Sequence, residues 1–151
     1  MATTAPVPRF VRIGNAVTTT LLRAGVKLAA PGDIPMYLLT VRGRKSGLPR
    51  TTPIVVLEQD GKRYLASPYG LVDWVRNIRA AGEAILTRAR RDEPVRAIEL
   101  SPREAGLVLK RSFERGIPSF IGKYFDVTAD SSDEEFEQAA VSHPVFALEK
   151  K

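Results

Sequence analysis

Apolar residues near the start of the chain recur at intervals of three and four positions. This spacing places them on one face of a helix and predicts an amphipathic helix between Pro8 and Ala30, ended by the dipeptide Pro31-Gly32. The apolar positions are Phe10, Ile13, Val17, Leu21, Ala24 and Leu28, and the cationic positions on a neighbouring face are Arg9, Arg12, Arg23 and Lys27. We expect the apolar face to pack on the rest of the domain, as most such helices do. The alternative is that this face lies in an acyl layer while the cations meet lipid headgroups.

From residue 36 onward the pattern changes to short runs rich in β-branched, leucine and tyrosine residues, which predict strands. The runs are MYLLTVRG (36–43), TTPIVVLE (51–58), KRYLAS (62–67), AILTRAR (84–90) and PVRAIEL (94–100). Asp60-Gly61 is a hairpin signal between the second and third runs. The polar residues 91–93 predict another hairpin between the last two. This succession favours an antiparallel meander over the strand-helix-strand alternation of a parallel sheet.

Other segments have the pattern of helices. Residues 73–81 (DWVRNIRAA) are closed by a glycine, and residues 101–116 begin with Ser101 as a capping residue and Glu104 three positions later. Residues 130–140 are predicted to form a solvated acidic helix. The apolar residues near the end of the chain indicate that this segment still docks on the body; they are Phe136, Val145, Phe146 and Leu148.

Length and composition indicate one domain, because 151 residues with 44% hydrophobic residues can bury a single core. We predict a single α+β domain over residues 1–151. It consists of an N-terminal amphipathic helix (1–31), a sheet with peripheral helices (36–125) and an acidic C-terminal segment (126–151). The sequence has no apolar run of about 20 residues and no signal-peptide pattern, so we expect a cytoplasmic protein.

Charge and residue usage narrow the chemistry. A net charge of +6 leaves an acidic ligand, an anionic membrane surface and nucleic acid open as partners. The chain has no cysteine and one histidine, which excludes thiolate nucleophiles and multi-histidine metal sites, so no metal is expected. An enzyme of this composition would use a bound organic cofactor, although a non-catalytic protein fits the same facts. His143 precedes a proline and is interpreted as a turn or packing residue.

The segment between the first two predicted strands concentrates positive charge. Residues 41–53 (VRGRKSGLPRTTP) hold four cations, two glycines and three hydroxyl side chains. Such a loop can surround a phosphate or carboxylate with charge-assisted hydrogen bonds, and the alternative is a solvated basic hairpin. It lacks the spacing of a P-loop or a Rossmann fingerprint. No aromatic residue interleaves with it to stack a base, so nucleic acid is not an expected partner.

A second informative segment runs from the end of a strand through a bend into a helix, residues 67–77 (SPYGLVDWVRN). Trp74 and Asn77 are three positions apart and share a helix face. An aromatic plane beside an amide suits a flat heteroaromatic ring. The alternative is that Trp74 belongs to the core and Asn77 makes a local backbone bond.

The run LLTVRGRKSGLPRTTPIVV, followed by SPYG and DWVRNIRAAG, resembles the deazaflavin-dependent nitroreductase family over residues 36–100. The resemblance implies an antiparallel split β-barrel that binds coenzyme F420, an 8-hydroxy-5-deazaflavin whose phosphate and oligoglutamate tail is strongly anionic. Flavin mononucleotide (FMN) on the same fold is the alternative cofactor. The cofactor contacts that it implies are Arg44, Lys45, Ser46 and Arg50 for the phosphate and tail, Thr51, Thr52 and Pro53 along the ring, and Ser67, Trp74, Arg76 and Asn77 closing the pocket.

The same resemblance implies a reductase that transfers a hydride to a small hydrophobic acceptor, namely a quinone, an activated alkene or a nitro compound. No residue is assigned to catalysis, and Tyr69 and Tyr124 are the candidate proton donors. The alternative function is a non-catalytic split-barrel protein that binds a fatty acid or another hydrophobic ligand. The resemblance also implies a homodimer, and the first helix leaves open a peripheral location at the inner face of the membrane.

Overall fold

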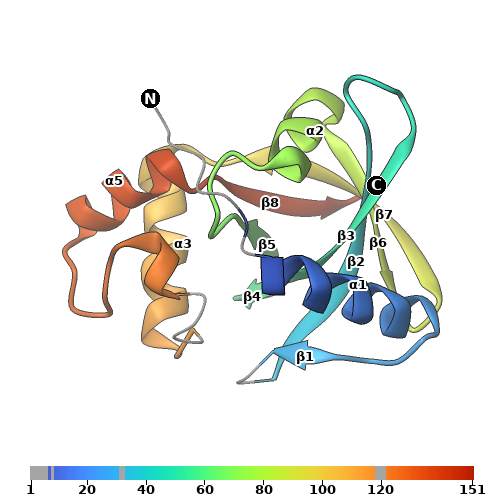
Figure 1. The fold of residues 1–151 in the computed structure, drawn as a ribbon. Helices are drawn as coiled ribbons and strands as arrows, with labels where there is room; N and C mark the ends of the chain where they lie inside the picture. Colours follow the sequence, from blue (N-terminus) through green and yellow to red (C-terminus); the bar gives the residue numbers. More distant parts are fainter. Residues whose placement is uncertain (1–6, 8, 31–32, 118–121) are drawn as a thin grey trace.

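The computed structural model describes residues 7, 9–30, 33–117 and 122–151, and its centre is a curled antiparallel sheet with helices around it (Figure 1). The strands are β1 (Ala29–Ala30), β2 (Ile34–Arg42), β3 (Pro49–Val55), β4 (Leu57–Gln59), β5 (Lys62–Ala66), β6 (Glu83–Arg88), β7 (Arg91–Glu99) and β8 (Val145–Lys150). The helices are α1 (Arg9–Arg23), α2 (Asp73–Ala81), α3 (Pro102–Glu114), α5 (Asp133–Ser142) and the short 3-10 helix η1 (Lys123–Phe125). The predicted α+β class and the antiparallel sheet are confirmed.

The end of the chain lies inside the sheet. The strand order is β1-β2-β6-β7-β8-β5-β4, with β3 paired to the other edge of β2. β8 inserts between β7 and β5, so that Leu148 pairs with Ala97 on one side and with Arg63 on the other. The sequence pattern indicated that this end docks on the body but did not predict a strand. A run of only six residues has too little alternation of apolar and polar positions to distinguish a strand from a loop that packs on the domain.

One predicted hairpin is confirmed and another is displaced. Asp60-Gly61 forms the turn between β4 and β5, with φ of 52° and 76°. Between β6 and β7 we predicted the turn at residues 91–93, but these residues are paired in β7 and the turn is made by Ala89-Arg90, with φ of 52° and 60°. A two-residue turn with positive φ at both positions matches the twist of the flanking strands. Alanine and arginine do not mark such a turn in a sequence, because they rarely adopt this conformation.

The predicted caps define the helices. In α3 the Ser101 hydroxyl accepts a hydrogen bond from the backbone N–H of Glu104, as the capping pattern predicts. α2 ends at Gly82, which has φ of 72°. The acidic helix begins at Asp133 rather than at residue 130, because Ser132 and Glu135 form a capping box there.

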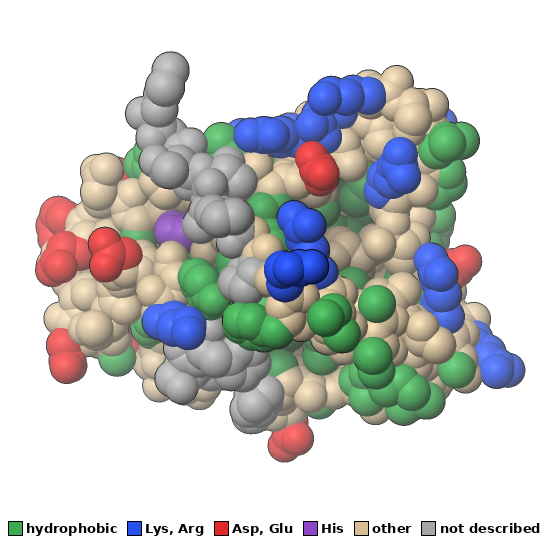
Figure 2. All heavy atoms as spheres, viewed as in Figure 1, with side chains coloured by type: hydrophobic (Ala, Val, Ile, Leu, Met, Phe, Trp, Pro, Cys, Tyr) green, Lys and Arg blue, Asp and Glu red, His purple; other side chains and the backbone are tan. Residues whose placement is uncertain are grey.

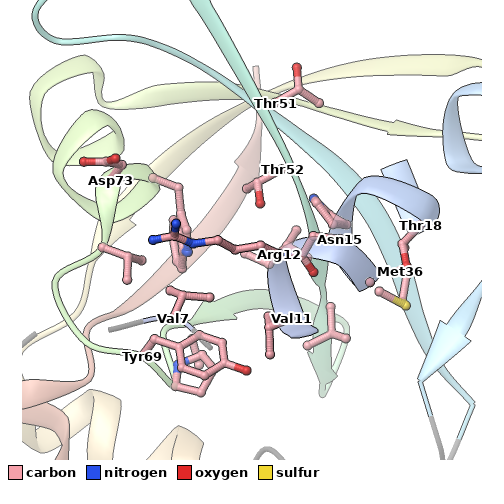
Figure 3. A pocket seen from close by; sticks show the side chains of 18 of the residues that line it. Val7, Val11, Arg12, Asn15, Thr18, Met36, Thr51, Thr52, Tyr69 and Asp73 are labelled. Atoms are coloured by element: carbon pink, nitrogen blue, oxygen red, sulfur yellow. The ribbon is translucent and has the colours of Figure 1, made fainter. Parts of the chain in front are cut away.

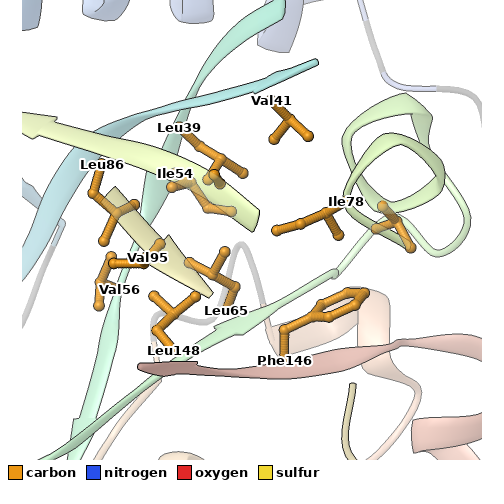
Figure 4. Close-up of a cluster of buried hydrophobic side chains, with 12 residues drawn as sticks. Leu39, Val41, Ile54, Val56, Leu65, Ile78, Leu86, Val95, Phe146 and Leu148 are labelled. Atoms are coloured by element: carbon orange, nitrogen blue, oxygen red, sulfur yellow. The ribbon is translucent and has the colours of Figure 1, made fainter. Parts of the chain in front are cut away.

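The core consists of two clusters of buried side chains. The first lies within the curl of the sheet and against α2, and Figure 4 shows Leu39, Leu65 and Ile78 converging there. The second lies between α3, α5 and the sheet. α3 and α5 approach closely at Gly106, where an added Cβ would come within 2.8 Å of the Glu137 backbone nitrogen. Fully burying one large apolar side chain contributes about 1.5–3 kcal/mol, so these clusters hold the sheet and helices together.

The first helix is shorter than predicted, because α1 ends at Arg23, Gly25 has φ of 89° and residues 29–30 form β1. α1 also does not pack through its apolar stripe, and our expectation that it would do so is wrong. Phe10 and Ile13 are 71% and 70% exposed, and Val17 and Leu21 also face solvent. The side that faces the sheet carries Val11, Asn15, Thr18 and Leu22, of which only Leu22 is buried. The physical reason is that this side covers a cavity instead of one of the two core clusters. Among the helices that the structure describes, none has the length and apolar character of a transmembrane span.

Candidate active site

A cavity of about 1080 Å³ lies between α1 and the sheet. Its walls come from α1, from β2 and β3, from the loop between them, from the β5–α2 bend and from η1. Pockets that hold drug-sized ligands have volumes of roughly 300–1,000 Å³, so this one has room for a ring system and a second small molecule. Lys and Arg side chains gather over this face, whereas the acidic ones gather over α5 (Figure 2).

The β2–β3 loop is closed by its own backbone bonds. The Gly43 N–H donates to the Leu48 carbonyl at 2.8 Å, and the Gly47 N–H donates to the Gly43 carbonyl at 2.9 Å. A Cβ at Gly43 would lie 3.0 Å from the Ser46 hydroxyl and 3.1 Å from the Leu48 oxygen. Only glycine fits that position without displacing the loop. The closed loop in turn determines the positions of Arg44, Lys45 and Arg50.

Asn77 ties this loop to α2. Its Oδ1 accepts hydrogen bonds from the Arg44 backbone N–H at 3.1 Å and from the Arg44 guanidinium at 2.8 Å. Asn77 is 4% exposed, and the second guanidinium nitrogen of Arg44 lies 3.4 Å from Asp73. The sequence left Asn77 as either a ring contact or a partner of the local backbone. In the structure its oxygen binds a residue that lies 33 positions away, although Asn77 also lines the cavity.

Most residues that the resemblance implied as cofactor contacts lie together around the cavity. Those that line it are Arg44, Lys45, Ser46, Arg50, Thr51, Thr52, Pro53, Trp74 and Asn77. Within the part of the chain that the structure describes, Lys45 and Arg50 have no carboxylate partner and are exposed. Trp74 is half-buried and meets both descriptions left open by the sequence, because it lines the cavity and also packs on Phe146 at 6.0 Å between ring centroids.

Ser67 and Arg76 are not among the residues that line the cavity. The Ser67 side chain is fully buried, and its hydroxyl donates a hydrogen bond to the Gly70 carbonyl at 2.6 Å. It therefore holds the β5–α2 bend in shape. Arg76 is exposed on the outer side of α2.

Two tyrosines form an edge-to-face pair at the cavity. The rings of Tyr69 and Tyr124 have centroids 4.7 Å apart and an interplanar angle of 63°. Burial raises the pKa of the Tyr69 hydroxyl above its usual range, and the neighbouring Tyr124 adds to that rise. The Lys123 ammonium lies 5.2 Å from the centre of the Tyr124 ring. Like any tyrosine, Tyr69 is protonated at neutral pH, and it can donate a hydrogen bond into the cavity.

His143 lies behind this bend and packs against it. Its Nδ1 is 3.0 Å from the Ser67 carbonyl oxygen, so Nδ1 carries the proton and donates. The ring also packs against Phe125 at an interplanar angle of 53°, with centroids 4.9 Å apart. Burial lowers the pKa of His143 below its ordinary value, against backbone hydrogen bonds that favour the charged form. These contacts confirm His143 as a packing residue at the end of α5.

Several lining residues were missed by the sequence analysis. They are Val7, Val11, Arg12, Asn15 and Thr18 near or on α1, together with Met36, Asp73 and Lys123. Figure 3 shows Arg12 extending from α1 over the cavity, with Thr52 and Tyr69 on its walls. The available signal was the spacing of Val11, Asn15 and Thr18, which share a second, more polar face of the helix.

The sequence profile of the F420H(2)-dependent quinone reductase family matches residues 15–120. The chain belongs to this family. It is thus an oxidoreductase enzyme that uses coenzyme F420. No curated protein matches the sequence of this F420-dependent reductase.

Solved structures share the split-barrel fold of this F420-dependent reductase. A domain-swapped dimer is 24% identical, with a TM-score of 0.55 over 93% of this chain and 97% of that chain. An F420-H2 dependent reductase is also 24% identical, with a TM-score of 0.53 over 76% of this chain and 93% of that chain. A protein of unknown function from Agrobacterium tumefaciens is 16% identical, with a TM-score of 0.51 over 99% of this chain and 59% of that one. Identities at this level establish the fold alone.

Proposed function

We propose that this reductase transfers a hydride from reduced coenzyme F420 to a quinone, an activated alkene or a nitro compound bound in the cavity under α1. The observation that carries the proposal is a row of uncompensated cations along a cavity with room for two molecules. A protein that binds only a fatty acid would need one cation for the carboxylate and an apolar wall for the chain. The concentration of charge on the β2–β3 loop favours a ligand with several negative groups.

The residues of the β2–β3 loop fit the anionic part of the coenzyme. Lys45 and Arg50 are exposed and unpaired among the described residues. Asn77 accepts a hydrogen bond from the Arg44 guanidinium and so holds that side chain in place. Ser46 accepts a hydrogen bond from the Leu48 N–H at 3.2 Å, which keeps its own hydroxyl proton available for a phosphate oxygen. The single phosphate of FMN would use only part of this wall, so its extent supports the deazaflavin tail.

The neighbouring strand fits the ring system. Thr51, Thr52 and Pro53 follow the loop directly on β3 and line the same cavity. The hydroxyls of Thr40 and Thr51 lie 2.9 Å apart, which restrains Thr51. We infer that these residues and Trp74 would hold the ring.

In its reduced form the bound coenzyme supplies a hydride, which carries two electrons. The chain holds the ring and the acceptor together, and α1 covers them from the solvent. A quinone that gains this hydride needs one proton to become a hydroquinone. Tyr69 and its neighbour Tyr124, whose rings pack against each other at the cavity, are the side chains we assign to donate or relay that proton.

The first experiment is a titration of the purified protein with oxidised coenzyme F420, followed by the coenzyme's fluorescence and repeated with FMN as competitor. We expect tight, salt-sensitive binding of the deazaflavin. The double variant Lys45→Ala, Arg50→Ala should raise the Kd at least about 100-fold, since each charge-assisted hydrogen bond contributes about 1.5–3 kcal/mol. The matched control is Arg91→Ala, Arg103→Ala, which removes the same charge from exposed positions that do not line the cavity.

Each outcome of that titration is informative. An unchanged Kd in the double variant, or an equal rise in its control, would mean that the β2–β3 loop does not bind the coenzyme. Tight binding of FMN in place of the deazaflavin would move the chain to the flavin-binding alternative. If neither cofactor binds but a fatty acid does, the non-catalytic alternative holds.

We further propose a cytoplasmic protein whose α1 contacts the surface of an anionic membrane. The supporting observation is the exposed stripe of Phe10, Ile13, Val17 and Leu21, beside a helix surface that carries cations and no acidic residue. Partial insertion would bury the stripe and bring the cavity close to acceptors dissolved in the bilayer. In a flotation assay with phosphatidylcholine-phosphatidylglycerol vesicles, the wild type should float at low salt.

The variant Ile13→Asp, Val17→Asp should stay in the soluble fraction in that assay. Its control, Leu107→Asp, Val141→Asp, changes two exposed apolar side chains on α3 and α5 and should still float. If the wild-type protein stays entirely in the soluble fraction, the membrane proposal is wrong, and the hydride-transfer proposal is unaffected.

A homodimer through the sheet is also proposed. Ile85 on β6 and Ile98 on β7 are exposed on the outside of the sheet, and one structural neighbour is a domain-swapped dimer. Light scattering after size exclusion should give twice the monomer mass, and Ile85→Lys, Ile98→Lys should reduce it to the monomer mass.

A further inference from the structure

We propose that Arg12 and Lys123 form an acceptor subsite that selects quinones carrying an acidic substituent. This inference rests on the proposed function, because it concerns the second molecule in the same cavity. It adds a substrate class, acidic quinones, and assigns Arg12 as the residue that determines specificity.

The positions of the walls place the acceptor on the side of α1. The basic β2–β3 loop and β3 supply the residues that fit the coenzyme, and α1 forms the opposite wall with Val11, Arg12 and Asn15. If the β3 residues and Trp74 hold the ring, the lining residues of α1 and η1 remain for the acceptor. The acceptor would have to approach the face of the ring to react, and the lining residues not assigned to the coenzyme include those of α1 and η1.

Arg12 brings an uncompensated charge to that space. Its side chain extends from α1 over the cavity (Figure 3). Among the residues that the structure describes, it has no carboxylate partner and no hydrogen bond. α1 contains no acidic residue in its first turn either. By contrast, Arg44 on the coenzyme side is held by Asn77 and Asp73.

Lys123 brings a second cation to the same cavity from a different element. It belongs to η1, and its ammonium lies over the Tyr124 ring, 5.2 Å from the centroid. This ammonium also has no carboxylate partner within the described part of the chain. Two such cations outside the basic loop favour an acceptor that itself carries negative charge, and they would also stabilise the oxyanion that forms when a quinone takes up a hydride.

The comparison with the family separates this subsite from the coenzyme site. The family profile matches residues 15–120, so it includes the whole β2–β3 loop, β3 and α2. Arg12 and Lys123 lie just outside the matched range at its two ends. The two cations assigned to the acceptor therefore lie outside the matched range that holds the coenzyme-side residues.

The test uses a matched pair of acceptors and the single tryptophan of the chain. Menadione is a neutral naphthoquinone, and naphthoquinone sulfonate replaces its methyl group by an anion. Trp74 lines the cavity, so quenching of its fluorescence reports the binding of either quinone without turnover. The same proteins are assayed for oxidation of reduced coenzyme F420 and for its binding.

Arg12→Ala should weaken binding of naphthoquinone sulfonate about tenfold, which corresponds to roughly 1.4 kcal/mol, and should lower kcat/KM for it by a similar factor. Binding of menadione should change by less than about threefold, and the Kd for the coenzyme should stay within about twofold. Arg12→Lys should retain most of the preference for the anion. Arg9→Ala, an exposed cation on the same helix that does not line the cavity, should have no effect.

The results separate the two proposals. An equal loss for both quinones, an equal effect of Arg9→Ala, or a larger effect of Arg12→Ala on the coenzyme than on the sulfonate would each overturn the acceptor subsite. Wild-type protein that binds both quinones but fails to bind the coenzyme would overturn the proposed function, and the quenching titrations would still decide the role of Arg12.

Discussion

The two walls of the cavity differ in how firmly the chain defines them. The β2–β3 wall is a closed hairpin, with pairs running continuously from Met36 with Val55 to Arg42 with Pro49. Its loop is bonded internally and fastened to α2 by Asn77. The α1 wall buries one side chain, Leu22, and turns its large apolar residues to the solvent.

This difference suits the two walls to different functions, coenzyme binding at the β2–β3 wall and acceptor exchange at the α1 wall. A wall that is fastened before the coenzyme arrives loses little conformational freedom on binding, which favours tight and selective binding. A helix attached through few buried contacts can open and close at low cost, which suits a site that must admit an acceptor and release a product in each turnover. We therefore expect substitutions on the two walls to have separable effects on coenzyme binding and on acceptor use.

The largest effect is expected where α1 is anchored. Leu22→Ala should lower the free energy of unfolding by about 2–4 kcal/mol, because a fully buried leucine leaves a cavity. Ile13→Ser, on the exposed stripe of the same helix, should change it by less than about 0.5 kcal/mol. Urea unfolding followed by circular dichroism measures both. Similar costs for the two variants would mean that α1 packs through its apolar stripe after all.

On the opposite wall, Asn77→Ala should raise the Kd for coenzyme F420 about 10- to 100-fold, because the Arg44 guanidinium and backbone lose a shared acceptor. The buried position also predicts a loss of about 1–2 kcal/mol of stability. Isothermal titration with the coenzyme gives the first quantity and urea unfolding the second. Arg76→Ala, the neighbouring exposed residue of α2, is the control and should leave both unchanged.

The sequence was most informative where function and folding are both local. The basic loop and the segment with Trp74 and Asn77 are each one continuous stretch, so each could be identified from the sequence, and the family resemblance implied that both line one site, as they do. The capping residues Ser101 and Glu104 likewise act within one turn. The interaction within this cap involves residues only three positions apart.

The orientation of α1 could not be predicted in the same way. Periodicity identifies a stripe on a helix, but whether that stripe faces a core, a membrane or solvent depends on the partner surface. Here the surface opposite α1 is a cavity wall. The bond between Asn77 and Arg44 and the insertion of β8 between β5 and β7 depend on pairings across long sequence separations, which local patterns do not encode.

A weaker effect is expected behind the β5–α2 bend, at His143. Burial lowers the pKa of this imidazole in the folded protein, so the unfolded chain binds its proton more readily. The stability that depends on neutral His143 is complete above the ordinary pKa of about 6.5 and is lost as pH falls through the lowered value. Unfolding in urea at pH values from about 7 to 5 should therefore show a decline. His143→Asn, which keeps a donor for the Ser67 carbonyl, should flatten it, and an unchanged slope would assign the decline to other groups.

The smallest expected effect comes from Asp73, the one acidic residue that lines the cavity within the described chain. Its carboxylate is 85% exposed and lies 3.4 Å from the Arg44 guanidinium. Removing its charge with Asp73→Asn should tighten coenzyme binding by about twofold to threefold, since a repulsion and a competing partner of Arg44 are both lost and an exposed pair is weak. The gain should disappear at high salt, where exposed charges are screened. Weaker binding in Asp73→Asn would instead mean that the carboxylate holds Arg44 in its binding position, so that the firm wall depends on Asp73 as well as on Asn77.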